Sequence, residues 1–482
     1  MTRSRWPKRD SKSVQAALSA HSILSPVLAG LFYILFLTGI LSVFSEELRI
    51  WETPELPVVT SLTSHGLGQA LDNAEAVSET GPSWMNIYLP TSGTPRFRIT
   101  SNDGAYQFGP EGELYAAQGT PWTDLIVEMH HQLNLPSLIG LTLVGLLGAA
   151  LLVLSLTGFL ALPRIFRDAF SLRLNSSERL RNTHLHNRLA VWTAPFHIAV
   201  AFSGAVLGLC SVLAIGIAEL DYGGRDGDVF APMEGDGPTA SPAITSQSIV
   251  ASYETLRTAY PQIEPAIILL RGAGTDQPTL QIMARHPDRL IYGEYYYFNG
   301  DGDLTGSAHV SDGTAGQQWF ATMYRLHFGS FGGLAVKIVY AVFGCCLVYI
   351  LISGMQIYFL KRGASARPAI RGEAVWRAYV WAVPAALVST LALASFLSIS
   401  GTGLLVSFWG IAMVALAAGA FIGHRAIRWV QLATGILLGL TAASGLAGVL
   451  HEGLVWRQIM VAGAFLLISL ALLRISQRDA SA

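Results

Sequence analysis

The sequence has 482 residues, of which 51% are hydrophobic and only 13% carry a charge. This composition excludes an ordinary soluble domain and indicates a membrane protein. The formal net charge of −1 is uninformative by itself, and no nucleic-acid partner is expected.

Eight segments are long and apolar enough to cross a bilayer as helices, since about 20 helical residues span its core and lipid cannot satisfy an open backbone. In chain order these predicted spans are 22–44, 136–163, 189–218, 333–360, 378–398, 403–422, 427–449 and 454–473. The first span is expected to remain as an anchor, because its apolar run is long and no small-residue cleavage site follows it.

The basic residues predict the orientation of the spans, because Lys and Arg gather in cytoplasmic loops. They cluster before the first span (3–12), between the second and third (164–181) and between the fourth and fifth (361–377). Both termini should therefore be cytoplasmic, with the loops 46–130 and 220–326 in the periplasm of a bacterial inner membrane. These loops are acidic, with 12 and 13 Asp and Glu residues against 3 and 6 Arg residues.

Both outer loops combine a helix pattern with short alternating strands, which predicts two small α+β modules of one repeated kind. In the first loop the expected strands are 86–90 and 96–100. In the second loop a helix at 244–258 precedes strands at 265–271, 278–284 and 291–298. The stretch NGDGDLTG (299–306) is interpreted as a hairpin turn, since Val310 occupies the place of the glutamate that an EF-hand calcium loop requires.

The predicted fold class is a membrane all-α bundle of about eight transmembrane helices with two small α+β modules. The expected divisions are the N-terminus and first span (1–45), the first module (46–130), spans two and three (131–219), the second module (220–326), span four (327–365) and a C-terminal four-helix extension (366–482).

The cysteines and the missing motifs exclude several kinds of chemistry. Cys210, Cys345 and Cys346 all lie in predicted spans, so neither outer loop can form a disulfide. Without a CxxCH motif there is no covalent c-type haem. The sequence also has no P-loop, no dinucleotide fingerprint, no HExxH and no nucleophile elbow, so neither a flavin nor a nicotinamide site is expected.

Histidines near the first four spans are candidate metal ligands. They are His21, His130, His186, His197 and His327. From His130 and from His327 to the basic residue at the inner end of the following span is 34 residues in each case, which predicts two imidazoles at one level near the outer face. His21 and His197 also match in distance from the outer ends of their spans, which predicts a second pair nearer the cytoplasm. Paired imidazoles are the axial ligands of a bis-histidine haem.

His186 is an alternative inner ligand. It lies 11 residues before His197, which on one continuous helix is three turns plus about 20°, so both rings would face one side with a rise of roughly 16 Å. It would either replace His197 or serve a further site. The neighbouring His131 is interpreted as a bystander.

Two b-type haems are therefore the expected cofactors. A neutral imidazole binds iron in both oxidation states, and two axial imidazoles give an iron suited to electron transfer. Glycine-rich stretches at 140–148 and 329–333 are expected to let the macrocycle approach. Arg188, Arg325 and Tyr324 stand beside candidate ligands and are candidates for binding haem propionates, with ordinary interfacial anchoring as an equal alternative.

These segments resemble the PepSY-associated transmembrane helix family of bacterial inner-membrane proteins. The resemblance covers about 15–365 and rests on ELRIW (47–51), HHQLNLP (130–136), IFRDAFSLR (165–173), HLHNRLAVWTAPFH (184–197) and LHFGSFGG (326–333), with SG at 203–204 and 353–354. The family's histidines fall on the same five positions. His184 stands where the family commonly has an aspartate that would orient the imidazole of His186.

The resemblance implies PepSY-like periplasmic modules and a two-haem reductase of ferric siderophores. Electrons from a quinol or a cytoplasmic reductase would pass from the inner to the outer haem and reduce a ferric chelate held by the modules. The last four spans lie outside the resemblance and have no evident cofactor residue. Two alternatives remain: a non-enzymatic PepSY membrane protein that regulates a periplasmic protease or assembly factor, and a proton-coupled transporter.

Overall fold

The computed structural model describes residues 10–78, 81–115, 119–162, 177–224, 229, 237–241, 243–287, 289–362, 367–397, 399–452 and 456–481. The chain forms two compact units. The helical unit comprises Met1–Glu52, Thr120–Leu209 and Leu334–Ala482, and the sheet unit comprises Thr53–Gly119 and Cys210–Gly333.

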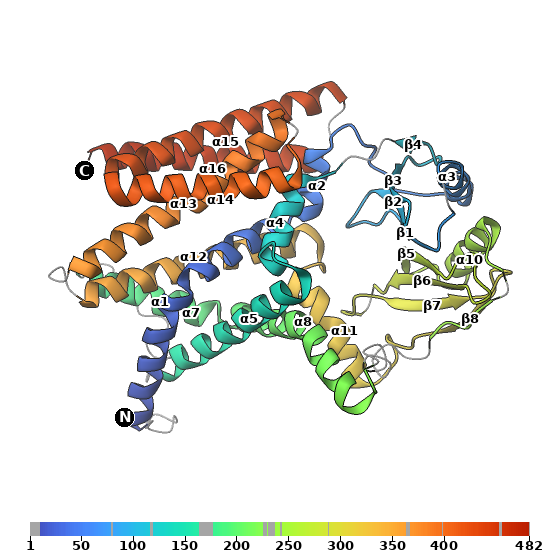
Figure 1. Ribbon diagram of the computed structural model, residues 1–482, viewed down its shortest axis with the longest axis horizontal. Coiled ribbons are helices and arrows are strands. Elements are labelled where there is room, and N and C mark those ends of the chain that lie inside the picture. Colours follow the sequence, from blue (N-terminus) through green and yellow to red (C-terminus); the bar gives the residue numbers. More distant parts are fainter. Residues whose placement is uncertain are drawn as a thin grey trace, which may run out of the picture. The chain divides into compact units, whose positions relative to one another are not determined.

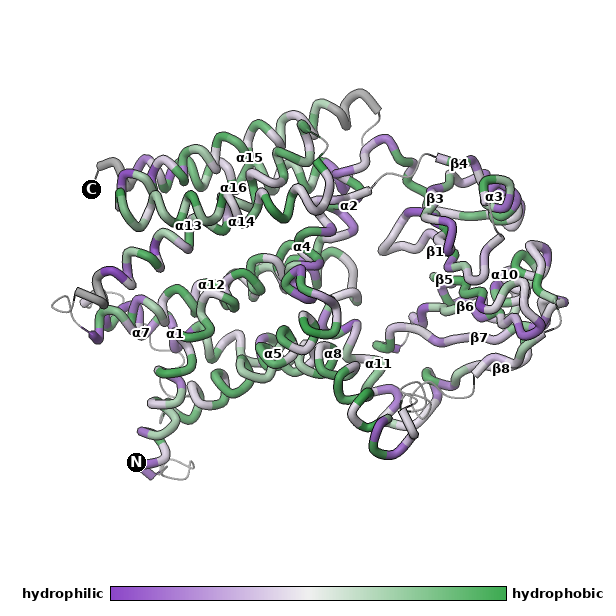
Figure 2. Tube along the Cα trace, viewed as in Figure 1, coloured by the Kyte–Doolittle hydropathy of each residue, from purple (hydrophilic) through white to green (hydrophobic). Residues whose placement is uncertain are grey.

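Eight helices among the described residues are long and apolar enough to cross a membrane, which confirms the predicted number of spans. They are α1 (Ser11–Ser42), α5 (Ser137–Leu160), α8 (Ala194–Asp221), α12 (Gly333–Arg362), α13 (Arg367–Leu397), α14 (Gly401–Ile422), α15 (His424–Glu452) and α16 (Trp456–Ser481) (Figure 1). Figure 2 shows that these helices are hydrophobic along most of their length. The chain is a multi-pass membrane protein.

Shorter helices stand between the spans and were not predicted as separate elements. They are α2 (Ser45–Glu52), α4 (Pro121–Gln132), α7 (Glu178–Trp192) and α11 (Ala315–Phe328). The sequence placed the residues of α2 and most of α4 in the first outer module, whereas the structure assigns both helices to the helical unit. The reason is that their apolar residues, among them Trp51, Trp122 and Met129, pack in the same core as the spans.

The two helices that carry His130 and His327 end before the following span begins. After α4, Leu133 and Asn134 adopt left-handed φ values of 56° and 53°, and after α11, Gly329 adopts 61°. A left-handed residue ends a helix. Counting the depth of these histidines along one continuous helix was therefore wrong.

The predicted third span, 189–218, is divided at Thr193. Helix α7 ends at Trp192 and α8 begins at Ala194. Pro195 stands in the first turn of α8, where the missing N–H has no helical acceptor to lose. His186 and His197 are thus on two different helices, and the premise that one continuous helix carries both was wrong.

Helix α2, which follows α1, forms polar contacts with two other helices of this unit, α12 and α4. Glu47 forms a buried ion pair with Lys337 of α12, with Nζ 2.7 Å from Oε2. Glu52 accepts hydrogen bonds from the backbone N–H groups of Trp122, at 2.8 Å, and Thr123, at 3.0 Å. These donors have no partner within α4 because they belong to its first turn, so Glu52 caps α4.

The sheet unit contains one antiparallel sheet of eight strands in the order β4-β3-β2-β1-β5-β6-β7-β8. Its elements are α3 (Ser64–Ala76), β1 (Trp84–Tyr88), β2 (Phe97–Ser101), β3 (Gly104–Phe108), β4 (Leu114–Tyr115), α10 (Ser246–Ala259), β5 (Glu264–Arg271), β6 (Thr279–Arg285), β7 (Glu294–Phe298) and β8 (Leu304–Ser307). Each half is a helix followed by four strands, which agrees with a repeated α+β module, although the sequence indicated only two strands in the first loop and three in the second. The halves join where β1 pairs with β5, with Ile87 opposite Ile268.

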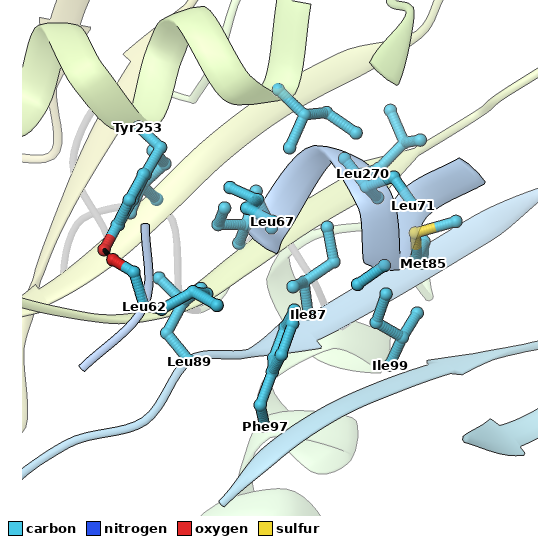
Figure 3. Packing of buried hydrophobic residues seen from close by; sticks show 14 of the residues in the cluster. Leu62, Leu67, Leu71, Met85, Ile87, Leu89, Phe97, Ile99, Tyr253 and Leu270 are labelled. Carbon is cyan, nitrogen blue, oxygen red and sulfur yellow. Dashed lines mark hydrogen bonds between the residues drawn. The ribbon is translucent and has the colours of Figure 1, made fainter. Parts of the chain in front are cut away.

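Helices α3 and α10 cover the same face of this sheet with a shared core. Leu67 and Leu71 of α3 and Tyr253 of α10 lie against strand residues such as Ile87 and Phe97 (Figure 3). The two predicted modules therefore bury one hydrophobic core between them.

The hairpin predicted after the strand at 291–298 is confirmed. Strand β7 pairs antiparallel with β8. In the turn, Asn299 Oδ1 accepts hydrogen bonds from the backbone N–H groups of Asp301, at 3.0 Å, and Asp303, at 2.8 Å. Gly302 supplies the left-handed φ of 83° that the turn needs.

Candidate functional site

His21 of α1 and His186 of α7 face each other inside the helical unit. Their ring centroids are 6.4 Å apart and the ring planes meet at 84°. The sequence offered both His197 and His186 as inner partners of His21. The structure brings His186 to that position.

The backbone of a different span holds each ring of this pair. His21 Nδ1 lies 3.0 Å from the carbonyl oxygen of Leu154 on α5, and His186 Nδ1 lies 2.9 Å from that of Ile350 on α12. A carbonyl oxygen can only accept, so Nδ1 is the protonated nitrogen in each neutral ring. Nε2 then keeps the lone pair that binds a metal ion.

A hydroxyl oxygen lies beside each of these two Nδ1 atoms. Thr157 Oγ1 is 3.4 Å from His21 Nδ1, and Ser353 Oγ is 3.3 Å from His186 Nδ1. Each hydroxyl gives the ring N–H a second acceptor and so adds to the orientation of the ring.

A glycine leaves room for each ring against the helix that holds it. A Cβ added at Gly158 would lie 3.4 Å from His21 Cε1, and one added at Gly354 would lie 3.1 Å from His186 Cε1. In both helices the glycine directly follows the hydroxyl residue. This Ser/Thr-Gly dipeptide is the sequence signal by which these positions can be found.

His130 is held by α1 in the same manner. Its Nδ1 lies 3.0 Å from the carbonyl oxygen of Leu35, and a Cβ added at Gly39 would come within 2.8 Å of its Cε1. Burial lowers the pKa of His130, and burial with the nearby His21 lowers the pKa of His186 to about 4. Both rings are thus neutral near pH 7, as metal ligands must be.

The other candidate residues have different surroundings. His197 is buried and stacks on Phe159, with centroids 5.9 Å apart and planes at 15°. Arg188 is buried in the helical unit. His327 and Arg325 lie on α11 in the sheet unit, where Arg325 donates to the carbonyl oxygens of two loop residues, Ser330 and Arg289. The pairing of His327 with His130 stays a prediction.

The glycine-rich stretch 140–148 does not serve the approach of a macrocycle. A Cβ added at Gly145 or Gly148 would lie 2.8 or 2.9 Å from the backbone of α8. Helix backbones this close leave no space for a porphyrin. Gly329 and Gly333 adopt φ values of 61° and 63° at the end of α11 and the start of α12. The expectation for 140–148 was therefore wrong, whereas that for 329–333 stays a prediction.

The sheet unit contains a positively charged cavity of about 270 Å³. It is lined by Ile267, Met283, Arg285, Tyr292, Tyr324, Arg325 and Ser330. Desolvation, and next the neighbouring Arg285, lower the pKa of Arg325. Glu264 lies 3.7 Å from Arg285 and offsets only one of the two charges. The cavity suits an anionic ligand, since guanidinium groups bind acidic oxygens with strong hydrogen bonds.

The histidine pair fits the axial ligands of a haem. Among the residues that the structure describes, no three His, Cys, Asp or Glu side chains gather around a bare metal site, but a haem needs only two protein ligands. Imidazoles that each place a nitrogen about 2 Å from one central ion have ring centres roughly 6 Å apart. The separation of His21 and His186 is 6.4 Å. Edge-to-face ring packing reaches the same distance, and a ligand role would in addition use the lone pairs of the two Nε2 atoms.

Fold and site together define a membrane protein in which imidazoles anchored to helix carbonyls accompany an α+β unit. Residues 18–362 match the family described as PepSY-associated TM region, and the chain belongs to this family. It is also similar, with 24% identity over 263 residues, to "Uncharacterized protein PA4219" of Pseudomonas aeruginosa. The match covers 52% of this chain and 66% of that protein. Helices α13–α16 lie beyond the family match.

Proposed function

We propose that this protein is a haem-containing oxidoreductase of a bacterial inner membrane that passes electrons to a ferric chelate, such as a siderophore, in the periplasm. The observation that carries the proposal is the pair His21 and His186. Two imidazoles from different helices face each other at 6.4 Å, and each has its Nδ1 directed to a carbonyl. This arrangement supports axial ligation of one iron.

In this proposal His21 and His186 hold the inner b-type haem. When bound, a haem supplies one-electron redox chemistry of iron. The chain contributes the ligands, and the carbonyls of Leu154 and Ile350 contribute their orientation and their basicity, as hydrogen-bond partners behind a ligating histidine do. We assign the inner position to His186 rather than to His197, because His186 lies opposite His21, whereas His197 stacks on Phe159 and has its Nδ1 3.4 Å from the hydroxyl oxygen of Thr193.

His130 and His327 are the proposed ligands of the outer haem. The anchoring of His130 Nδ1 to Leu35 supports this role, because it repeats the contact of the inner ligands. His327 is proposed from the family resemblance, and it lies within the matched residues 18–362.

The cavity around Arg285 and Arg325 is the proposed seat of the ferric chelate. Chelators that bind Fe(III) do so through hard, acidic oxygen atoms, which the guanidinium groups would attract, while Tyr292 and Tyr324 offer aromatic walls. Transfer of one electron converts Fe(III) to Fe(II). Hard oxygen ligands hold Fe(II) far more weakly, so the metal leaves without cleavage of any bond in the chelator.

The electron donor is proposed to be a membrane quinol or a cytoplasmic reductase. The sequence has no flavin or nicotinamide fingerprint, so the electron must come from a partner or from a lipid-soluble carrier. The basic clusters at 164–181 and 361–377 are expected to face the cytoplasm, where such a partner would bind.

Purification of the full chain in detergent tests the proposal. Protein from haem-replete cells should be red, with about two haems per chain and an α band of the b type that appears on reduction. Addition of a ferric chelate to the reduced protein should make this band decay, while a gallium chelate, which cannot accept an electron, should leave it unchanged. A colourless preparation would overturn the proposal and favour the regulator or the transporter.

A further inference from the structure

The three histidines that bond to helix carbonyls share one local arrangement, which we call a histidine cradle. A cradle consists of the residue that offers the carbonyl, a Ser or Thr three positions later and a Gly four positions later. The cradles are Leu35, Thr38 and Gly39 on α1, which hold His130; Leu154, Thr157 and Gly158 on α5, which hold His21; and Ile350, Ser353 and Gly354 on α12, which hold His186.

The spacing explains how a cradle works. Residues four positions apart lie one above the other on a helix, so a side chain at the later position would cover the earlier carbonyl. Glycine removes that cover, and an imidazole can reach the carbonyl oxygen, which has a second lone pair beyond its helical hydrogen bond.

The hydroxyl of each cradle is fixed in place by its own helix. Thr157 Oγ1 donates to Val153 O at 2.7 Å, and Ser353 Oγ donates to Tyr349 O at 2.8 Å. Thr38 Oγ1 makes the same bond to Ile34 O at 2.8 Å. Because the proton is used in this bond, the hydroxyl oxygen is left as an acceptor.

We propose that the cradles are positioning elements that set the reduction potential of the iron, an inference that rests on the proposed function. Each cradle fixes the ring by its Nδ1–H and increases the electron density on Nε2. A more basic ligand favours Fe(III) over Fe(II), so an intact cradle lowers the reduction potential.

A Ser/Thr-Gly pair without a histidine only leaves space on the surface of its helix. Helix α15 contains Thr434 and Gly435, and a Cβ added at Gly435 would lie 3.1 Å from Leu473. The same distance, 3.1 Å, separates a Cβ at Gly354 from His186. Gly435 is therefore a control with the same nearest contact distance but with leucine in place of histidine.

The same triplet is present on α8, in Val200, Ser203 and Gly204. Ser203 Oγ donates to Ala199 O at 2.7 Å and to Val200 O at 3.3 Å, as the hydroxyls of the other cradles do. Each of α1, α5, α8 and α12 thus carries one such triplet. His197 cannot fill the triplet on α8, because it is part of the same helix about two turns away.

The experiment compares glycine variants of the full-length protein purified in detergent. The readouts are haem content, reduction potential by redox titration and the electron paramagnetic resonance signal of the ferric state, none of which depends on turnover. Gly354→Ala should raise the potential of one haem and shift its ferric signal. Gly158→Ala should do so less, because its Cβ would be 3.4 Å away, and Gly39→Ala should lose about half of the haem, because 2.8 Å forces the ring to move.

The control and the hydroxyl variants separate ligand positioning from packing. Gly435→Ala should lower the melting temperature and leave both potentials unchanged. Ser353→Ala should raise one potential, and Ser353→Thr should restore it. The cradle proposal would be overturned, while the proposed function stands, if the wild-type protein is red but Gly354→Ala and Gly435→Ala have equal effects on the potentials and Ser353→Ala has none. Colourless wild-type protein would overturn both.

Discussion

The imidazole of His21 meets that of His186 at 84°, with 6.4 Å between the ring centroids. The two residues come from α1 and α7, and the carbonyls that orient them belong to α5 and α12. Four helices therefore converge on one pair of side chains. Each of the two rings is expected to be necessary for the same site.

The first prediction concerns the loss of that site. His21→Ala and His186→Ala should each reduce the haem content by about half, and the double variant should lose no more than either single one, because both changes empty the same iron site. A pyridine haemochrome assay measures the content. His309→Ala is the control, since His309 is exposed and pairs with Asp312 at 3.1 Å. Equal loss in the control would contradict the assignment.

His197 should be dispensable for haem binding. His197→Phe should keep the full haem content, because the ring stacks on Phe159 and phenylalanine can preserve that contact. The absorbance ratio of the Soret band to the protein band provides the measurement. Loss of half of the haem in this variant would indicate that His197 is the inner haem ligand.

The arginine cavity should determine the affinity for the chelate. Arg285→Gln removes a charge-assisted hydrogen bond, for which about 1.5–3 kcal/mol is usual, so the KM for an anionic ferric chelate should rise roughly 10-fold or more. The haem spectrum should not change. Arg257→Gln is a suitable control, because this arginine lies over the Tyr253 ring, at 5.3 Å, and does not line the cavity. An unchanged KM in Arg285→Gln would show that the chelate binds outside this cavity.

The ion pair between α2 and α12 should be important for stability. The side chains of Glu47 and Lys337 are only 5% and 15% exposed, so Glu47→Gln leaves a buried ammonium group without its counter-charge and should cost about 3–5 kcal/mol. Unfolding of the detergent-solubilised protein by SDS measures this loss. The double variant Glu47→Gln with Lys337→Met should recover much of the stability, and a double variant as unstable as the single one would show that the pair has another role.

Glu52 should make stability depend on pH. Burial raises the pKa of Glu52 above its ordinary value of 4.5, and this effect exceeds the opposite effect of its hydrogen bonds to Trp122 and Thr123. The folded protein therefore holds the proton more tightly. This contribution to stability is complete below pH 4.5 and is lost as the pH rises through the raised pKa.

Glu52→Gln removes this titration. Between about pH 5 and about pH 8 the Tm of the variant should fall less than that of the wild type, even if its absolute value is lower. Thermal unfolding at several pH values gives the comparison. Parallel curves would mean that Glu52 is not the responsible group.

Local patterns were sufficient to predict most of the elements. Eight spans follow from apolar length alone, and the expected strand at 265–271 agrees with β5, because alternation along a strand is a local property. The interruption at Leu133 was not predictable in this way. A left-handed leucine has no signal in composition, in contrast to Gly329 after α11.

The candidate site was predictable in its residue types and less so in its pairs. All five histidines were singled out from the sequence, but the choice between His186 and His197 depended on the break at Thr193. Gly39, Gly158 and Gly354 are important because each leaves room for a histidine ring from a segment that is distant in the sequence. No spacing within one helix reveals which side chain will occupy such a gap.

The pairing of Ile87 with Ile268 has a consequence for biogenesis. The ribosome synthesises β1 before α5 and α8, and β5 only after them. Until β5 is made, the edge of the first half-sheet along β1 has unpaired backbone N–H and C=O groups. An unpaired sheet edge can pair with strands of other chains and so promotes aggregation. The first half therefore needs protection, by a chaperone or by rapid synthesis of the second half, until β5 pairs with β1.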